Sequence, residues 1–205
     1  MNFKKERSSG VFRIGFIGRV VPIKDVKTFI RACSIIYSEL KNTEFYIIGP
    51  TDEDEDYYRE CEVLVEMESL QGVFKFTGKV DLRQYYPKLD VIVLTSISES
   101  QPIVILEAGA YGIPAVATDV GACSELLYGS SPDDKLLGQS GIITPVYNAQ
   151  ATAEAVIRIL KDADLYSRMS EAGIKRVSTY YRMDNLIATY QMLYSRYIQE
   201  SRWQE

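Results

Sequence analysis

The segment DVIVLTSISESQPIVILEAGAYGIPAVAT, residues 90–118, decides the fold class of this chain. It begins with a short run, residues 90–94, that is apolar at every position after the first, and it closes with a second apolar run. Strands that are apolar on both faces are typical of parallel sheets covered by helices on both sides. Residues 102–111 between them are expected to form a helix, with Pro102 at its first position and Gly112 at its end. The segment therefore predicts a strand–helix–strand unit.

The same alternation extends outward in both directions along the chain. The predicted strands cover residues 11–17, 44–48, 73–77, 90–94, 114–118 and 141–144. The other predicted helices cover residues 26–41, with Asp25 as N-cap, 57–70, ended by Gly72, and then 151–162, 165–180 and 185–201. We therefore predict an α/β fold: a Rossmann-like, doubly wound, mostly parallel sheet with helices on both faces and a helical C-terminal tail.

Composition limits the size and class of the protein. The chain has 205 residues, of which 46% are hydrophobic and 25% charged, as in a single globular domain. We expect this domain to cover residues 11–205, with the helical part from about residue 150, and residues 1–10 to be a disordered or artificial N-terminal extension.

Several function classes are excluded by what the sequence lacks. Without a histidine the chain cannot form a Ser/His/Asp or Cys/His nucleophile system or a histidine metal site. Its three cysteines form no CxxC pair, and Cys123 is expected to pack in the core. A net charge of -5 argues against a nucleic-acid partner, and no apolar run reaches the ~18 residues of a transmembrane segment. We expect a cytoplasmic protein.

The loops after the predicted strands are where a doubly wound sheet binds its ligand. The first runs from Gly18 to Asp25 and places Arg19 and Lys24 before a helix N-terminus, a combination that suits a diphosphate. Two solvated cations beside a helix cap are the alternative interpretation. The acidic run at residues 52–56 is expected to be a solvated loop before a helix, since it lacks the pattern of a calcium loop.

Two glutamates separated by seven residues mark the fourth loop and the helix that follows it. Glu99 is expected at the crevice, whereas Glu107 falls in an otherwise apolar helix, where a carboxylate needs a partner. Vicinal hydroxyls of a ribose would satisfy it, because a carboxylate accepts two hydrogen bonds side by side. An internal salt bridge, for example to Arg19, is the alternative.

This pair of glutamates resembles the E-x7-E signature of family 4 glycosyltransferases of the GT-B fold, and residues 18–24 resemble their GR…K loop. The resemblance covers nearly the whole chain, but only the C-terminal, donor-binding half of such an enzyme. It implies that Arg19 and Lys24 hold the donor diphosphate, that Glu107 holds the ribose and that Glu99 meets the donor sugar. It further implies contacts to sugar and phosphate from backbone amides near Gln101, Ile103 and Val104, and a border of the base at Lys79 and Val80. Gly18 would belong to the same substrate-binding set.

The resemblance also implies an activity. The parent protein would be a retaining glycosyltransferase of exopolysaccharide synthesis, with UDP-glucose as donor and without a metal or other cofactor. The isolated domain would be inactive, because the N-terminal acceptor-binding domain is absent. Expected partners are that domain, a polysaccharide-synthesis complex, which could hold the protein at the inner face of the membrane, or a second copy bound through the stripe from Tyr190 to Trp203. A GT-B-like nucleotide-sugar epimerase, a non-catalytic nucleotide-sugar-binding module and a purely structural module are the alternatives.

Overall fold

The structure is a computed structural model that describes residues 10–201, with side chains described to residue 198. Six strands form one sheet, and every pairing between neighbours is parallel. The strands are β1 (Phe12–Ile17), β2 (Thr43–Ile48), β3 (Phe74–Phe76), β4 (Val91–Leu94), β5 (Ala115–Thr118) and β6 (Gly141–Thr144), in the order β3-β2-β1-β4-β5-β6. This is the strand order of a doubly wound Rossmann sheet, so the predicted fold class is confirmed. The expectation for residues 1–10 falls outside the described residues, apart from Gly10.

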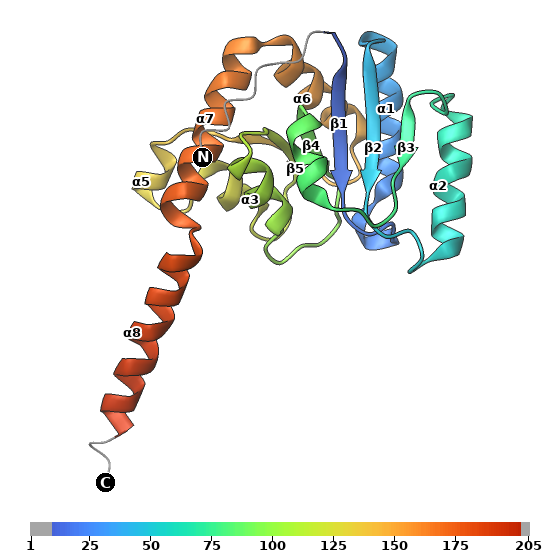
Figure 1. Ribbon diagram of the computed structural model, residues 1–205. Helices are drawn as coiled ribbons and strands as arrows, with labels where there is room; N and C mark the ends of the chain where they lie inside the picture. The colour runs from blue at the N-terminus through green and yellow to red at the C-terminus, as the bar shows by residue number, and fades with distance from the viewer. Residues whose placement is uncertain (1–9, 202–205) are drawn as a thin grey trace.

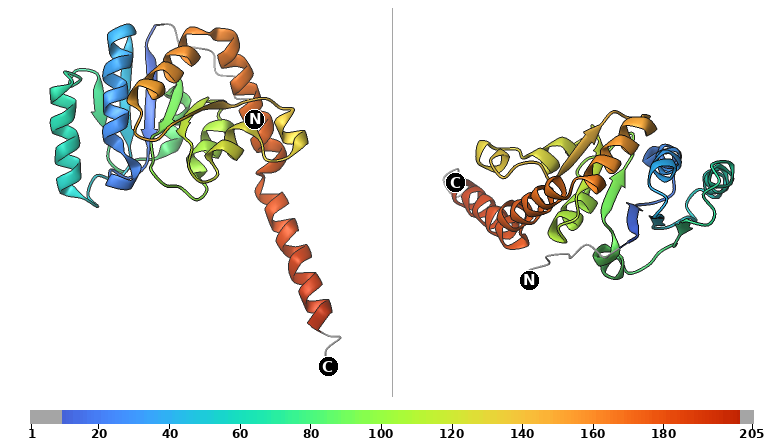
Figure 2. Two further views of the ribbon diagram at one scale, coloured as in Figure 1. Left: turned by 180° about the vertical axis from the view of Figure 1, so that it is seen from behind. Right: turned by 90° about the horizontal axis from the view of Figure 1, so that it is seen from above.

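Helices cover both faces of the sheet (Figures 1 and 2). The α-helices are α1 (Val26–Glu39), α2 (Glu55–Met67), α3 (Ile103–Ala110), α4 (Cys123–Tyr128), α5 (Pro132–Lys135), α6 (Ala149–Lys161), α7 (Ala163–Tyr180) and α8 (Met183–Ser201). There are also three 3-10 turns: η1 (Pro22–Lys24) between β1 and α1, and η2 (Leu82–Gln84) and η3 (Tyr86–Lys88) between β3 and β4. Helices α1, α2 and α6 pack together on one face, α3 and α4 cover the other, and α7 packs against both α3 and α6.

Local capping explains most helix boundaries and corrects two predictions. Asp25 caps α1 as expected and accepts a hydrogen bond from the backbone of Thr28. Helix α2 starts earlier than predicted because Asp54, within the acidic run, caps it, and it ends before Ser69, whose φ of +56° breaks the helix, rather than at Gly72. Pro102 is the N-cap of α3 and not its first helical residue. Short α4 and α5 lack the apolar period and were not predicted.

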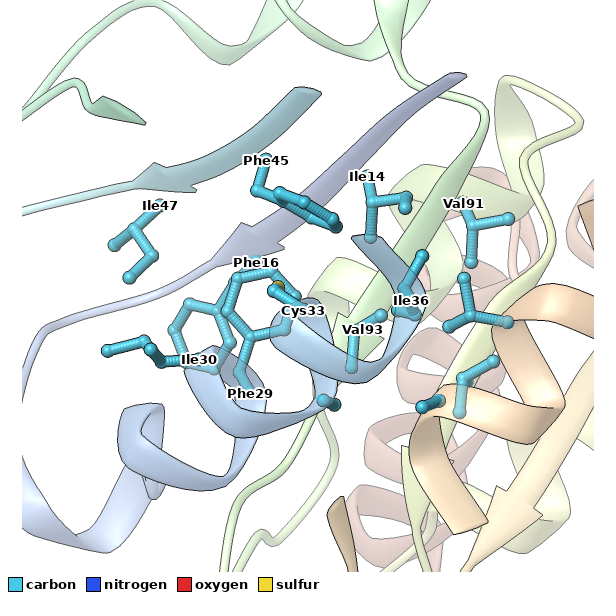
Figure 3. Packing of buried hydrophobic residues seen from close by; sticks show 14 of the residues in the cluster. Ile14, Phe16, Phe29, Ile30, Cys33, Ile36, Phe45, Ile47, Val91 and Val93 are labelled. Carbon is cyan, nitrogen blue, oxygen red and sulfur yellow. The ribbon is translucent and has the colours of Figure 1, made fainter. Parts of the chain in front are cut away.

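The core consists of two apolar layers, one on each face of the sheet. Figure 3 shows the layer beneath α1, where Phe16 of the sheet packs against Phe29 of the helix and Phe45 belongs to the same cluster. The opposite layer is built from β4, β5, α3 and α4 and includes buried Tyr86. Residues of β4 are buried on both faces, as the apolar run at residues 90–94 predicted.

A buried ion pair lies next to the N-terminal end of β6. Arg176 of α7 and Asp134 of α5 lie 2.7 Å apart, and each side chain is only 1% exposed. The guanidinium also donates to the backbone carbonyls of Leu127 and Gly138 and to the hydroxyl of Ser140. These bonds fasten the connection between α4 and β6 to α7.

The last helix leaves the body of the molecule. Figures 1 and 2 show α8 projecting beyond the sheet and its covering helices. Large apolar side chains are exposed along it, at Met183, Leu186, Ile187, Tyr190, Met192, Leu193, Tyr194, Tyr197 and Ile198. The predicted stripe is therefore exposed as far as it is described; Trp203 lies outside the described residues. None of the described helices combines the length and apolarity needed to cross a membrane.

Candidate functional site

The candidate site lies where the strand order reverses, between the C-terminal ends of β1 and β4. The loop from Gly18 leads into η1, and the loop from Thr95 leads toward α3. These two loops are joined by hydrogen bonds. The amide of Ile97 donates to the carbonyl of Ile23 at 2.9 Å, and the buried hydroxyl of Thr95 lies 2.8 Å from the carbonyl of Asp25 and 3.2 Å from that of Lys24. The backbone of Lys24 is thereby held against the end of β4.

Lys24 and Glu99 form an ion pair across the two loops. Their Nζ and Oε1 atoms are 2.5 Å apart, and the side chains are 18% and 11% exposed. The hydroxyl of Ser96 donates to the same oxygen of Glu99 at 2.7 Å, and Thr118 donates to the carbonyl of Ser96 at 2.6 Å. Buried hydroxyl groups from the ends of two strands thus fix a partly exposed charge pair at the crevice.

A glycine after β5 allows a third loop to approach Glu99. Gly121 has φ of +51°, and a Cβ atom there would lie 2.0 Å from the backbone oxygen of Glu99. The amide of Ala122 donates to the carbonyl of Ser100 at 3.0 Å. Any side chain at position 121 would therefore displace the backbone that carries Glu99.

A cavity of 220 Å³ opens at the C-terminal ends of β1 and β2, and neither Lys24 nor Glu99 lines it. It is lined by Ile17, Gly18, Arg19, Ile48, Gly49, Pro50, Lys79, Val80 and Leu82. Its walls are therefore the loops after β1, β2 and β3, at the C-terminal edge of the sheet. Four predicted site residues, Gly18, Arg19, Lys79 and Val80, meet here.

The guanidinium of Arg19 is exposed at the edge of this cavity and is 2.7 Å from Glu53. Glu53 belongs to the acidic run, so part of that run neutralises a candidate ligand-binding cation. Exposed pairs of this kind contribute only about 0–1 kcal/mol, because water screens both charges. The pair can therefore open at small cost when an anion competes for Arg19.

Glu107 is half-buried in the middle of α3 and accepts a hydrogen bond from the hydroxyl of Tyr86 at 2.7 Å. The alternative of an internal salt bridge to Arg19 is wrong, since Arg19 pairs with Glu53 and Glu107 pairs with a tyrosine. Burial and this carboxylate raise the pKa of the Tyr86 hydroxyl far above its usual value, so the tyrosine is a neutral donor at physiological pH.

The amides of Ile103 and Val104 lie in the first turn of α3, where a helix offers its N–H groups no internal acceptor. Gln101 precedes the cap, is exposed and lies in the same loop as Glu99. The amides of Gln101, Ile103 and Val104 can donate to an anion or a sugar oxygen. Pro102, between Gln101 and Ile103, has no N–H to donate.

Four residues that support the site were not predicted from the sequence. Tyr86, Thr95, Ser96 and Thr118 are buried polar side chains next to the predicted site residues. A run of hydroxyl residues at the ends of apolar strands was a usable signal for the last three. Tyr86 gave no signal, because nothing in the local pattern predicts that its hydroxyl meets Glu107.

Thiol and metal chemistry find little support at this site. Burial raises the pKa of the Cys123 thiol to about 11, so it is a core residue, as predicted, rather than a nucleophile. Among the described residues, no three His, Cys, Asp or Glu side chains are grouped so that they could hold a metal ion.

Comparison with known proteins places this architecture in a family. The profile of the family described as Glycosyl transferases group 1 matches residues 11–162. The chain is 25% identical over 190 residues to the capsular polysaccharide biosynthesis glycosyltransferase CapM of Staphylococcus aureus, covering 93% of this chain and 47% of CapM.

Two solved structures show the same fold. The C-terminal domain of the glycosyl transferase group 1 family protein LpcC from Francisella tularensis is 25% identical, with a TM-score of 0.73 over 85% of this chain and 88% of that domain. HepE from Anabaena in complex with UDP-glucose is 21% identical, with a TM-score of 0.81 over 91% of this chain and 49% of HepE.

The chain spans less than half the length of the first curated relatives that it matches, 42% and 47%. LpcC, by contrast, matches over nearly the whole of its isolated C-terminal domain. The family profile covers the sheet, both central loops and the glutamate pair. This chain therefore belongs to the group 1 glycosyl transferases and corresponds to their C-terminal type of domain.

Proposed function

We propose that this chain is the donor-binding domain of a retaining glycosyltransferase and that its crevice binds a nucleoside-diphosphate sugar, with UDP-glucose as the donor. The observation that carries the proposal is the Lys24–Glu99 pair at the switch point of the sheet, 2.5 Å apart and only partly exposed. A diphosphate is an anion, so it can take the place of the Glu99 carboxylate at Lys24, whereas a neutral ligand cannot.

The proposed roles follow from position and chemistry. Lys24 and Arg19 bind the diphosphate and stabilise its charge as it leaves, which makes them catalytic together with Glu99. The amides at the start of α3 add donors to the same anion. Released from Lys24 by the incoming phosphate, Glu99 is free to accept hydroxyl groups of the sugar. No metal is required for this arrangement, because two side-chain cations and a helix terminus supply the positive charge.

The base and ribose are assigned to the two neighbouring features. The cavity beside Gly18, with largely apolar walls and Lys79 and Val80 at its border, suits a planar base. Glu107, whose carboxylate faces Tyr86, is proposed to bind the ribose hydroxyls. Support for uracil comes from the fold shared with HepE, which was solved with UDP-glucose.

The biological setting is a finer proposal. The residues from Gly18 to Ala32 and from Asp119 to Leu127 resemble PelF, a glycosyltransferase of Pel exopolysaccharide synthesis. A relative, CapM, acts in capsular polysaccharide biosynthesis. We therefore place the parent protein in exopolysaccharide synthesis, in a complex with other proteins of that process.

A complete GT-B enzyme closes two domains around the donor, so we propose that this domain alone is inactive. The exposed apolar side of α8, at Leu186, Tyr190 and Leu193, is the proposed contact for the acceptor-binding domain. Sedimentation analysis of the isolated chain tests this. A monomer that binds a separately produced acceptor domain supports the assignment, and a tight homodimer through α8 contradicts it.

Calorimetric titration tests the donor site itself. UDP, UDP-glucose, UMP and GDP are titrated into the wild-type chain and into Glu107→Ala, with Glu125→Ala, an exposed glutamate of α4, as control. The proposal predicts saturable binding of UDP and UDP-glucose near a Kd of ~1 mM, about -4 kcal/mol, weaker binding of UMP and GDP, and a loss in Glu107→Ala only. A folded chain that binds no nucleoside diphosphate would contradict it.

A further inference from the structure

A buried tyrosine stands behind the proposed ribose-binding carboxylate. Tyr86 is 2% exposed and comes from η3, in the connection between β3 and β4. Its hydroxyl donates to Oε2 of Glu107, with 2.7 Å between the oxygens. The contact joins two segments that are 21 residues apart in the chain. It is therefore a property of the folded protein and not of α3 alone.

The tyrosine ring is itself held in place. It stacks on the ring of Tyr111, with the centroids 5.0 Å apart and the planes at 14°. Tyr111 follows the last residue of α3, the helix that carries Glu107. The ring is thus aligned by one end of α3 while its hydroxyl contacts the middle of the same helix. This arrangement leaves little rotational freedom to the Tyr86 hydroxyl.

The two carboxylate oxygens of Glu107 therefore differ in their hydrogen-bond partners. Oε2 is occupied by Tyr86, and within the described residues no side chain donates to Oε1. Because the tyrosine stays neutral, it always donates, and the carboxylate is kept from rotating. A carboxylate fixed in this way keeps Oε1 in a constant orientation. Fixed acceptors lose less entropy on binding a ligand than freely rotating ones.

We propose that Tyr86 is a positioning residue that holds Glu107 so that its second oxygen reads the ribose hydroxyls of the nucleotide. This inference rests on the proposed function, because it needs a nucleoside diphosphate in the crevice. It adds a specific consequence: discrimination between ribose and deoxyribose depends on a hydroxyl group that does not touch the ligand.

The test compares Kd values for UDP and for 2′-deoxy-UDP in the wild type and in Tyr86→Phe. Loss of one hydrogen bond to a charged acceptor corresponds to about tenfold or more in Kd, so the wild type is expected to prefer UDP by about tenfold. In Tyr86→Phe this preference falls to about threefold or less, because UDP loses more affinity than 2′-deoxy-UDP, which offers only its 3′-hydroxyl to Glu107. A variant that keeps the full preference for UDP overturns the inference.

Tyr46→Phe is the matched control. Tyr46 donates to Glu44 at 2.6 Å, so the same kind of tyrosine–carboxylate bond is removed away from the crevice. This variant should keep the wild-type preference. A general effect of losing a tyrosine hydroxyl would lower the preference in both variants and would also overturn the inference.

A second variant covers the case in which Tyr86→Phe does not fold. Tyr111→Leu keeps the Tyr86 hydroxyl but removes the ring on which Tyr86 stacks. It should lower the preference for UDP as well, and an unchanged preference overturns the inference. The proposed function fails separately, and this inference with it, when the folded wild-type chain does not bind UDP at all.

Discussion

Two ion pairs at opposite ends of the strands differ in how far they are buried. Arg176 and Asp134 lie 2.7 Å apart with side chains that are 1% exposed, and further bonds from the guanidinium saturate its donors. Lys24 and Glu99 are as close, yet their side chains are 18% and 11% exposed and they face the crevice. The first pair cannot exchange its partner without exposing a buried charge. The second can, and this difference separates a structural ion pair from one that is available to a ligand.

Breaking the buried Arg176–Asp134 pair should have the largest effect, which is a loss of folding stability. Arg176→Ala leaves Asp134 buried without its partner, which is expected to cost about 3–5 kcal/mol of stability. Urea denaturation followed by circular dichroism measures this. Arg168→Ala, an exposed position on the same helix, is the control and should change stability by less than about 0.5 kcal/mol. Comparable losses in both variants would mean that the buried pair has no special role.

Removing a contact that holds Lys24 of the Lys24–Glu99 pair in place should have a smaller effect, which is a loss of ligand affinity. Thr95→Val removes the hydroxyl that holds the carbonyls of Lys24 and Asp25. We expect a UDP Kd about three- to tenfold higher, equivalent to roughly 1 kcal/mol for one hydrogen bond. Thr43→Val removes a comparable buried hydroxyl contact, to the carbonyl of Leu40, at the other edge of the sheet. An equal loss of UDP affinity in the control would show that general destabilisation is responsible.

The smallest effect concerns thiol reactivity and pH. The pKa of Cys123 is raised to about 11 in the folded chain, above the ~8.5 of a free thiol, because burial disfavours the thiolate. Stability from this group is therefore complete below the pKa of the unfolded thiol and is lost as pH rises toward 11. Alkylation mapped by mass spectrometry should accelerate tenfold per pH unit between pH 8 and pH 10. An alkylation rate that stops rising near pH 9 would show that the Cys123 thiol has an ordinary pKa.

Sequence patterns predicted the strands well because parallel strands in this fold are short, apolar and separated by helices. The run at residues 90–94 and the glutamate pair were enough to predict which edge of the sheet carries the candidate site. The positions of Arg19 and Lys24 were predicted, but their partners were not. Glu53 and Tyr86 reach the site through tertiary packing, and no local period encodes that. The capping role of Asp54 was missed for a different reason: its contact with the amide of Tyr57 is local, but several neighbouring acids could equally have capped the helix.

The most direct test that the Lys24–Glu99 pair binds a diphosphate is to compare the affinity for UDP of the wild-type chain, Lys24→Ala and Lys27→Ala. Lys27 of α1 pairs with Glu60 of α2 at 2.5 Å, the same distance as Lys24 with Glu99, but with side chains that are 29% and 59% exposed. We expect the Kd for UDP to rise about tenfold to a hundredfold in Lys24→Ala, as for the loss of a charge-assisted bond of about 1.5–3 kcal/mol, and to stay unchanged in Lys27→Ala. Equal affinities in all three proteins would contradict the claim that the Lys24–Glu99 pair opens to bind a diphosphate.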